Sequence, residues 1–448
     1  MSPVSRRSFL VGATAAAAAT RARIDSVAAE SIARPSLEPT YPRTATCFLE
    51  HDELPKVSEL AAFDVVIVDS EWAHRVRRSY FEQLRSVSPR TIVLAYVNLV
   101  DSLPRTGSPG YWANAYSLWQ FQSSTDSQFP TEWLAHTGDG RPVHEWQERV
   151  MTNLTDVAPR IAGQTYAEYA AHWVADKVWA TGLWDGVFLD VWGDRIYTAD
   201  SDRWDIDGDG VDELDEDIYG PGNPLDRGLL LAERIMRRRM PSAVLVANGD
   251  RSACGGLLDG LAFESFADRL ADPDRHLTTE VERYVSKSTS DGLRRPGLNL
   301  TINVDRSIQA APADRLRRAR FFLTATLLQN AFWAPMGTNY GQLAYFDELD
   351  GAGHGRGYLG RAVEAFPDLA TVTRPVTRGT GSLSPGVFRR DFEHGIAIVN
   401  TTAETCMIEL ERPYRRLRGT QDPLVNDGSL AESVTLLPED GVILLAAR

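Results

Sequence analysis

Short apolar runs alternate with segments of helical spacing through most of the chain. Each run is bounded by glycine or polar residues, which is typical of a strand buried on both faces of a parallel sheet. Between several runs the apolar residues recur with a helical period, as they do in residues 163–180, 229–240 and 313–331. The eight strand candidates are Thr44–Leu49, Asp64–Val68, Thr91–Val97, Gly186–Leu189, Ala243–Ala247, Gly260–Phe263, Leu298–Val304 and Phe332–Pro335.

This alternation indicates βαβ units and a parallel sheet. Eight such units over residues 44–374 predict an α/β fold of the (β/α)8, or TIM barrel, type. A doubly wound open sheet is the alternative.

After about Arg374 the pattern changes to short strands separated by turn sequences such as Asn426-Asp427-Gly428. We predict a small C-terminal antiparallel β-sandwich module over residues 375–448. Its expected strands are Val387–Arg390, Ile396–Val399, Cys406–Leu410, Tyr414–Leu417, Ser433–Leu437 and Val442–Leu445.

The N-terminal residues have the features of a targeting segment. Arg6 and Arg7 precede the apolar run Val11–Ala19, an arrangement that looks like a twin-arginine export signal over residues 1–29. Residues 30–43 form a proline-containing lead-in to the barrel. The run is too short to span a bilayer, and no other stretch is apolar enough, so we expect a secreted or cell-surface protein without a membrane span. A disordered basic leader is the alternative.

Composition narrows the function further. A net charge of −14 argues against nucleic acid or an anionic membrane as partner and fits a neutral or basic substrate. Three cysteines give no disulfide framework. No lysine stands at a predicted strand end, which disfavours a Schiff-base aldolase. Sequence motifs for catalytic zinc, a serine nucleophile or a nucleotide are missing as well. We expect a monomer.

Acidic residues follow several predicted strands, where parallel barrels carry their chemistry. Asp190 and Glu264 end the fourth and sixth strands, and Asp69 ends the second. Cleavage of a glycosidic bond needs one carboxyl group that donates a proton and another that is ionised. Asp190 and Glu264 are the natural pair, with Asp69 as a third catalytic candidate, either a base or a substrate ligand. For any one of them, a helix cap or a partner of arginine is the structural alternative.

Aromatic and amide side chains near the same strand ends suit a sugar. Sugar rings stack their C–H faces on aromatic rings, and their hydroxyls need fixed polar partners. Many of the 11 tryptophans fall in predicted rim loops, including the long connection over residues 100–159, although at least half should lie in the core. The candidate substrate-binding residues are Trp72, Asn98, Trp192, Asn248, Asn303 and Trp333.

An aspartate-rich segment over residues 205–217 fits the twelve-position calcium loop. Acids occupy its first, third, fifth, ninth and twelfth positions, glycine its sixth, and a backbone carbonyl is available at its seventh. The predicted Ca²⁺ ligands are Asp205, Asp207, Asp209, Val211, Glu213 and Glu216. Because the flanks are not a helix pair, we expect a structural Ca²⁺ that braces the loop after the fourth strand. A solvated acidic loop is the alternative.

Taken together, Trp184–Asp190, the loop 205–217, Phe388–Asn400 and Tyr414–Pro423 resemble the hypothetical glycosyl hydrolase family fifteen. The chain is also distantly similar to endo-α-galactosaminidase-type barrels. The resemblance implies a barrel glycoside hydrolase. Retaining α-glycosidase barrels often carry nucleophile and acid on the fourth and sixth strands, which this arrangement resembles.

We therefore expect an exported, calcium-braced glycoside hydrolase that cleaves a polysaccharide or oligosaccharide, with Asp190 as nucleophile and Glu264 as general acid and base. A non-catalytic carbohydrate-binding barrel at the cell surface is the main alternative. A lyase or deacetylase is a third, which no metal or lysine motif supports.

Overall fold

Eight parallel strands form the central sheet of the computed structural model, which describes residues 36–102, 130–146, 149–252, 254–288, 292–374 and 383–447. Adjacent strands in the sheet are also consecutive among these eight, so the predicted (β/α)8 barrel is confirmed. In order they are β1 (Ala45–Phe48), β2 (Val65–Asp69), β3 (Ile92–Asn98), β7 (Gly186–Asp190), β8 (Val244–Asn248), β9 (Gly260–Glu264), β10 (Leu300–Val304) and β11 (Phe332–Met336).

The first and last strands lie side by side and are joined by one isolated β-bridge in the described structure. Thr44 and Trp333 form a parallel bridge, and the Trp333 amide donates a 3.0 Å hydrogen bond to the Arg43 carbonyl. This contact closes the sheet into a barrel, so that the C-terminal ends of all eight strands form one ring.

Alternation along the strands explains why each run is apolar throughout. In β2, Val65 and Ile67 belong to the cluster inside the barrel, whereas Val66 and Val68 belong to the larger core under the helices. Both faces of each strand are therefore buried, as the continuous apolar runs predicted.

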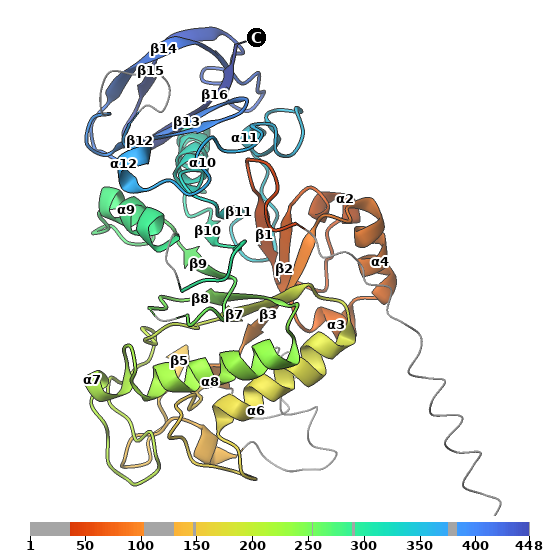
Figure 1. Ribbon diagram of the computed structural model, residues 1–448, viewed down its shortest axis with the longest axis vertical. Helices are drawn as coiled ribbons and strands as arrows, with labels where there is room; N and C mark the ends of the chain where they lie inside the picture. Colours follow the sequence, from red (N-terminus) through yellow and green to blue (C-terminus); the bar gives the residue numbers. More distant parts are fainter. Residues whose placement is uncertain are drawn as a thin grey trace, which may run out of the picture. The chain divides into compact units, whose positions relative to one another are not determined.

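Helices of varied length connect the strands. The four-residue helices are α2 (Val57–Leu60), α3 (Trp72–Arg75), α7 (Asp215–Ile218), α11 (Asp347–Asp350) and α12 (Leu369–Val372), and the longer ones are α4 (Arg78–Val87), α6 (Tyr166–Trp173), α8 (Pro224–Arg239), α9 (Leu277–Ser288) and α10 (Pro312–Thr326). Helices α6 and α8 lie side by side (Figure 1). In the described part of the β8–β9 connection no helix occurs, which departs from a regular (β/α)8 repeat.

The long connection after β3 carries a small antiparallel sheet. Its strands are β4 (Asp101–Ser102), β5 (His144–Trp146) and β6 (Arg149–Met151), and they follow one another in the order β4-β6-β5. Trp133 of this connection is buried and donates its indole N–H to the Pro159 carbonyl at 3.1 Å. Trp112 and Trp119, two of the tryptophans in the predicted rim loop over residues 100–159, lie outside the described residues.

The C-terminal module is one antiparallel sheet of five strands in the order β12-β13-β16-β14-β15. The strands are β12 (Val387–Phe392), β13 (Gly395–Asn400), β14 (Cys406–Arg416), β15 (Leu430–Leu436) and β16 (Asp440–Ala446). Strand β14 runs through both segments that we expected as separate strands, because an irregularity between Glu409 and Tyr414 interrupts the pairing without ending it.

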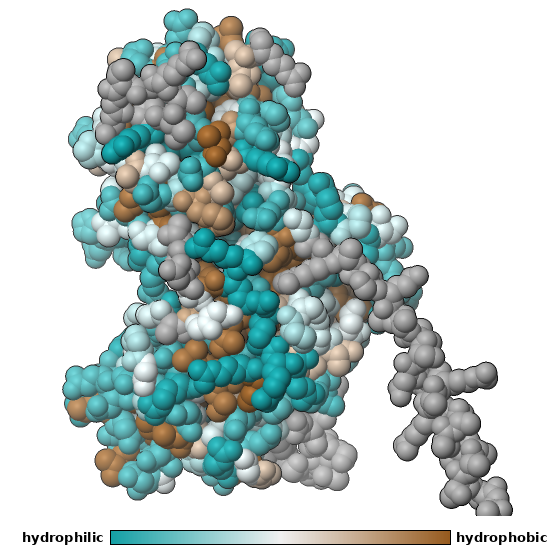
Figure 2. Space-filling view, in the orientation of Figure 1, coloured by the Kyte–Doolittle hydropathy of each residue, from teal (hydrophilic) through white to brown (hydrophobic). Residues whose placement is uncertain are grey.

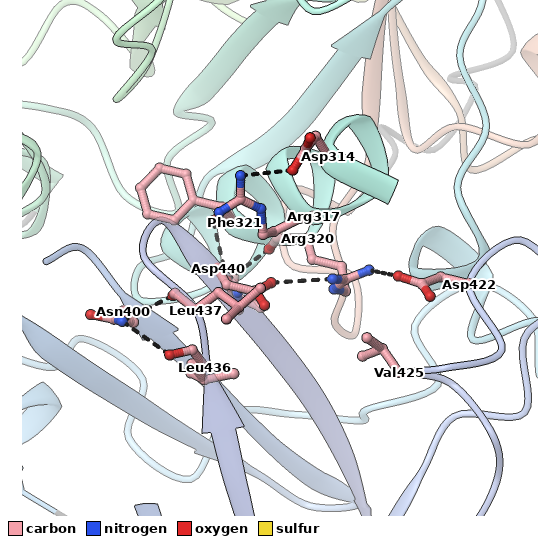
Figure 3. A network of polar contacts seen from close by, with 12 residues as sticks. Asp314, Arg317, Arg320, Phe321, Asn400, Asp422, Val425, Leu436, Leu437 and Asp440 are labelled. Atoms are coloured by element: carbon pink, nitrogen blue, oxygen red, sulfur yellow. Dashed lines mark hydrogen bonds and ion pairs between the residues drawn. The ribbon is translucent and has the colours of Figure 1, made fainter. Parts of the chain in front are cut away.

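The module packs on α10, as Figure 1 shows. Arg320 of α10 is 3% exposed and binds Asp422 at 2.6 Å and Asp440 at 3.3 Å (Figure 3). Nearby, Arg317 donates a 2.7 Å hydrogen bond to the Pro438 carbonyl. A buried charge with two acidic partners thus ties the module to the barrel.

Residues 37–448 form one compact unit, and of the residues before it only Ser36 is described. The predicted export signal and residues 30–35 of the lead-in lie outside the described residues. Within the described ranges, no helix combines the length and apolarity needed to cross a membrane. Hydrophilic residues predominate on the face in Figure 2, with scattered apolar ones.

Replacing Arg320 should destabilise the protein strongly. Arg320→Ala leaves the Asp422 and Asp440 carboxylates without their buried partner, which costs about 3–5 kcal/mol in similar cases. Urea unfolding of the full chain measures the loss. Arg269→Ala is the matched control, because the more exposed Arg269–Glu439 pair also joins barrel and module and should contribute at most about 1 kcal/mol. Equal losses in the two variants would contradict the role of Arg320.

Candidate active site

Two carboxylates meet at the C-terminal end of the barrel through one amide. Asn248, the last residue of β8, donates from its Nδ2 atom to Asp190 Oδ1 of β7 and to Glu264 Oε2 of β9, each at 2.8 Å. An amide nitrogen has two N–H groups, so it can serve both acids at once. The predicted pair therefore lies together, and Asn248 fixes its geometry.

Two tyrosines complete the hydrogen bonding of the pair. Tyr96 of β3 donates its hydroxyl to Asp190 Oδ2, and Tyr340, in the loop after β11, donates its hydroxyl to Glu264 Oε1. The ring of Tyr96 also stacks on Phe188, with 6.0 Å between the ring centroids. Each carboxylate oxygen thus has a fixed donor.

The backbone turns sharply just after each acid. Val191 follows Asp190 with a φ of 51°, and Ser265 follows Glu264 with a φ of 50°. This left-handed conformation is strained, and a β-branched valine rarely adopts it. A hydrogen bond of 2.7 Å from the Trp192 amide to the Asn248 carbonyl holds the first turn. These two residues change the direction of the chain as it leaves each strand.

The carboxyl group of Asp190 is harder to ionise than that of an ordinary aspartate. Burial is the main cause and the charge of Glu264 the next, and together they raise the pKa of Asp190 to about 6, although the donors Tyr96 and Asn248 oppose the shift. The same charges act on Cys47 of β1, inside the barrel, because burial and then Glu264, Asp190 and Asp69 raise the pKa of its thiol well above its usual value.

Asp69, the third catalytic candidate, ends β2 on the same rim. Its Oδ1 atom accepts a 2.8 Å hydrogen bond from the Glu71 amide, and burial raises its pKa to about 7. Its charge reaches Cys47, yet none of its hydrogen bonds in the described structure joins it to Asp190 or Glu264. Asp69 is therefore a neighbour of the pair rather than a member of it.

A second buried charge cluster supports the strands that carry the pair. The Arg251 side chain, fully buried after β8, binds Asp194, Asp226 and Glu233 at 2.8, 2.7 and 3.1 Å. Trp192 donates its indole N–H to the same Glu233 at 2.9 Å, and burial raises the pKa of Glu233 to about 7. Because Asp194 follows β7 and Arg251 follows β8, this cluster fixes the loops beyond Asp190 and Asn248.

The predicted sugar-binding residues separate into two groups. Asn248 lies between the two acids. The indoles of Trp72, Trp192 and Trp333 are at most 1% exposed and donate to Glu50, Glu233 and Asn303 respectively, so their faces are not open to a sugar, contrary to expectation.

Asn98 and Asn303 are buried as well. Asn98 donates to Asp101 at 3.1 Å, and Asn303 donates to the Phe266 carbonyl at 2.9 Å and accepts from Trp333. Both amides thus satisfy neighbouring protein groups. Sequence reasoning missed Tyr96 and Tyr340. Tyr96 could have been found, because it lies two residues before Asn98 and so on the same face of β3.

A cavity of about 230 Å³ opens beside Asn248 and Glu264. Among its lining residues, Arg283 binds Glu280 at 3.0 Å and Asp250 at 3.5 Å. Lys287 also pairs with Asp250. The basic side chains that line this cavity are therefore paired with acidic ones, so their charges are largely neutralised.

The aspartate-rich loop lies between β7 and α8. Oxygen atoms of Asp205, Asp207 and Asp209 lie within 4.8 Å of one another, and Gly210 at the sixth position has a φ of 88°. Hard carboxylate oxygens at this spacing suit Ca²⁺. Glu213 and Glu216 stand outside this group of three; Glu213 accepts a 2.9 Å hydrogen bond from the Ile206 amide.

The chain belongs to the family described as hypothetical glycosyl hydrolase family 15, whose match covers residues 85–396. That range includes both acids, Asn248, both tyrosines and the aspartate-rich loop. The fold and family define a barrel protein of the glycoside hydrolase class. The sequence matches none of the curated proteins with which it was compared.

Several solved structures are similar to the chain at low identity. The glycoside hydrolase domain of PelA from Pseudomonas aeruginosa is 16% identical, with a TM-score of 0.37, over 66% of this chain and 93% of that one. Eubacterium rectale Amy13B is 9% identical, with a TM-score of 0.46, over 93% and 97%. A family 39 glycoside hydrolase from Bacteroides cellulosilyticus WH2 is 13% identical, with a TM-score of 0.45, over 92% and 81%.

Asp190 should make the stability of the protein depend on pH. Its folded-state pKa of about 6 exceeds the unfolded value of about 3.9, so the folded state binds the proton more tightly. Stability contributed by this group is thus present below about pH 4 and is lost as pH rises through 6. Asp190→Asn removes the penalty and should stabilise the protein by roughly 2–3 kcal/mol at pH 7.5 but not at pH 4.

Urea unfolding at the two pH values measures this difference. Asp305→Asn is the control with the opposite sign: burial raises the pKa of Asp305, but Ser307 and Arg315 outweigh it and hold that pKa below its usual value. The control variant should lose stability at pH 7.5. An Asp190→Asn effect that is the same at both pH values would contradict the raised pKa.

Proposed function

We propose that the protein hydrolyses glycosidic bonds of a polysaccharide or oligosaccharide with Asp190 and Glu264. The observation that carries this proposal is the Asn248 amide, which contacts both carboxylates at 2.8 Å. Two acids held at a fixed separation on a barrel rim are what glycoside hydrolysis requires. Membership of a glycosyl hydrolase family supports the same conclusion.

In this mechanism Asp190 is the nucleophile. Hydrogen bonds from Tyr96 and Asn248 to its two oxygens fix its orientation, and above about pH 6 it is ionised. Its carboxylate attacks the anomeric carbon while the more exposed Glu264 gives a proton to the leaving oxygen. In the second step the Glu264 carboxylate takes a proton from water, and that water displaces Asp190 from the sugar.

The separation of the acids favours retention of the anomeric configuration. Since one nitrogen lies 2.8 Å from an oxygen of each acid, those two oxygens are separated by no more than twice that distance. Retaining enzymes place their carboxyl groups roughly 5–5.5 Å apart, whereas inverting enzymes need roughly 6.5–9.5 Å to admit a water. The charge-balanced cavity beside Glu264 suits a substrate without a strong net charge.

We also propose a structural Ca²⁺ in the aspartate-rich loop. Asp205, Asp207 and Asp209 would bind it, with the Val211 carbonyl, Glu213 and Glu216 completing the set as the loop closes. The loop is joined to the active site by the Arg195–Asp215 ion pair and by the Gly220 amide, which donates to the Asp194 carbonyl at 3.1 Å. The export-signal pattern over residues 1–29 supports action outside the cytoplasm, where free Ca²⁺ is more abundant.

Removing either acid should abolish hydrolysis. Asp190→Asn and Glu264→Gln should each lower kcat/KM by more than about a hundredfold, because general acid–base help alone is of that order. Released reducing ends from a polysaccharide panel measure the rate. Glu50→Gln, at the end of β1 on the same rim, is the control and should change it less than about tenfold.

The two roles can be told apart by rescue. Azide should restore glycosyl transfer in Asp190→Gly by taking the place of the lost nucleophile. The glycosyl azide should have inverted configuration with Asp190→Gly, after one displacement, and unchanged configuration with Glu264→Gly, after two. An inverted glycosyl azide from Glu264→Gly would instead make Glu264 the nucleophile. Full activity in both Asp190→Asn and Glu264→Gln would overturn the proposed function.

Calcium should stabilise the protein against heat. A ligand that binds only the folded state at a hundredfold excess over its Kd adds about 2.7 kcal/mol, so Tm should rise when Ca²⁺ is added to chelator-treated protein. Asp207→Asn and Asp209→Asn should lose this rise. Asp217→Asn, in the same acidic loop but outside the twelve positions, should keep it. A Tm unaffected by Ca²⁺ in the unmodified protein would refute the site.

A further inference from the structure

A second cavity, of about 520 Å³, lies at the rim beside the ends of β10 and β11. Its lining includes Ile308 and Arg315 from the β10–α10 region, Thr338 and Gln342 from the loop after β11, and Tyr345 and Gln421. The volume falls in the range of small-molecule sites, which is roughly 300–1,000 Å³. Three separate stretches of the chain converge on it.

The lining combines apolar surface with uncharged polar groups. Ile308 is 51% and Tyr345 53% exposed, so both present apolar surface to solvent beside the cavity. Arg315 is neutralised by Asp305 across a 2.9 Å hydrogen bond from its Nε atom. An exposed aromatic ring with amide and hydroxyl groups nearby fits a neutral sugar residue, which offers both C–H faces and hydroxyls.

The loop after β11 both lines the cavity and reaches the candidate active site. In the loop after β11, Thr338 donates its hydroxyl to Gln342 Oε1 at 2.7 Å, and these residues face the cavity. Between them lies Tyr340, whose hydroxyl binds Glu264. A substrate chain at Glu264 therefore needs to extend only across this short loop to reach the cavity.

The C-terminal module holds the opposite wall in place. Gln421 donates from Nε2 to the Tyr345 carbonyl at 3.2 Å and accepts at Oε1 from the Asp347 amide at 2.8 Å. The next residue, Asp422, is bound by Arg320 of α10 (Figure 3). The module thus fixes the segment that presents the Tyr345 ring.

We propose that this cavity binds a further sugar residue of the same neutral polysaccharide that is cleaved at Asp190 and Glu264, with the ring of Tyr345 as the stacking surface. The proposal rests on the proposed function, since it takes the occupant to be that substrate. It gives the C-terminal module a part in substrate binding. It also implies that long chains are better substrates than a single glycoside, which cannot reach the cavity.

Tyr345→Ala tests the proposal, and Tyr345→Phe is the matched control that keeps the ring but loses the hydroxyl bonded to Asp350. The full chain is run through native gels containing starch, dextran, galactan, xylan or mannan, and hydrolysis is followed on the same polymers and on aryl monoglycosides. With Tyr345→Ala, the polymer in the gel should slow the protein less than it slows the unmodified chain. KM on the polymer should rise about five- to tenfold, the size expected for one stacking contact. Its kcat/KM on the monoglycoside and its Tm should stay unchanged, and Tyr345→Phe should match the unmodified protein.

The outcomes separate the two proposals. Hydrolysis by the unmodified protein with identical polymer kinetics in Tyr345→Ala overturns the sugar site and leaves the proposed function standing. Slowed migration in the polymer gels that depends on Tyr345, without any hydrolysis, overturns the proposed function and supports the sugar site. If the protein is neither slowed by nor active on any of the polymers, both proposals are overturned.

Discussion

Closure of the parallel sheet is the constraint on which the rest of the structure depends. One bridge between Thr44 and Trp333 joins the first strand to the last and turns eight strand ends into a ring. In an open sheet the ends of β3, β7, β8, β9 and β11 would lie in a row, and the residues that surround the acids could not face a common centre. Closure also dictates that every strand is buried on both faces, which explains the apolar runs that first revealed the fold.

Inside this ring the protein has to place negative charge where solvent is scarce. Burial raises the pKa values of Asp69 and Asp190, and each nearby carboxylate adds to the effect. The barrel offsets this cost with neutral donors rather than with cations: an amide from β8 and phenolic hydroxyls from β3 and the loop after β11. Cations are kept one layer further out, where Arg251 neutralises the acids behind the strands.

The sequence allowed the fold to be predicted closely, because the spacing of apolar residues and the glycines that bound each strand are local signals. All eight barrel strands occur where the apolar runs predicted them, and Asp190, Asn248 and Glu264 meet as strand ends should. Tyr340 could not be predicted, since it lies in an irregular loop whose path is set by tertiary contacts. The tryptophans misled for a related reason: an indole N–H can be satisfied by a buried carboxylate or carbonyl, as in Trp192 and Trp72, so position near the rim does not decide exposure.

The amide of Asn248 has a further consequence. Unlike a carboxyl or phenol group, an amide does not ionise at ordinary pH, so Asn248 holds the two acids in position without passing a proton between them. A proton on Asp190 cannot pass to Glu264 along this bridge. The exposed Glu264 side chain therefore has water, and not Asp190, as its proton partner.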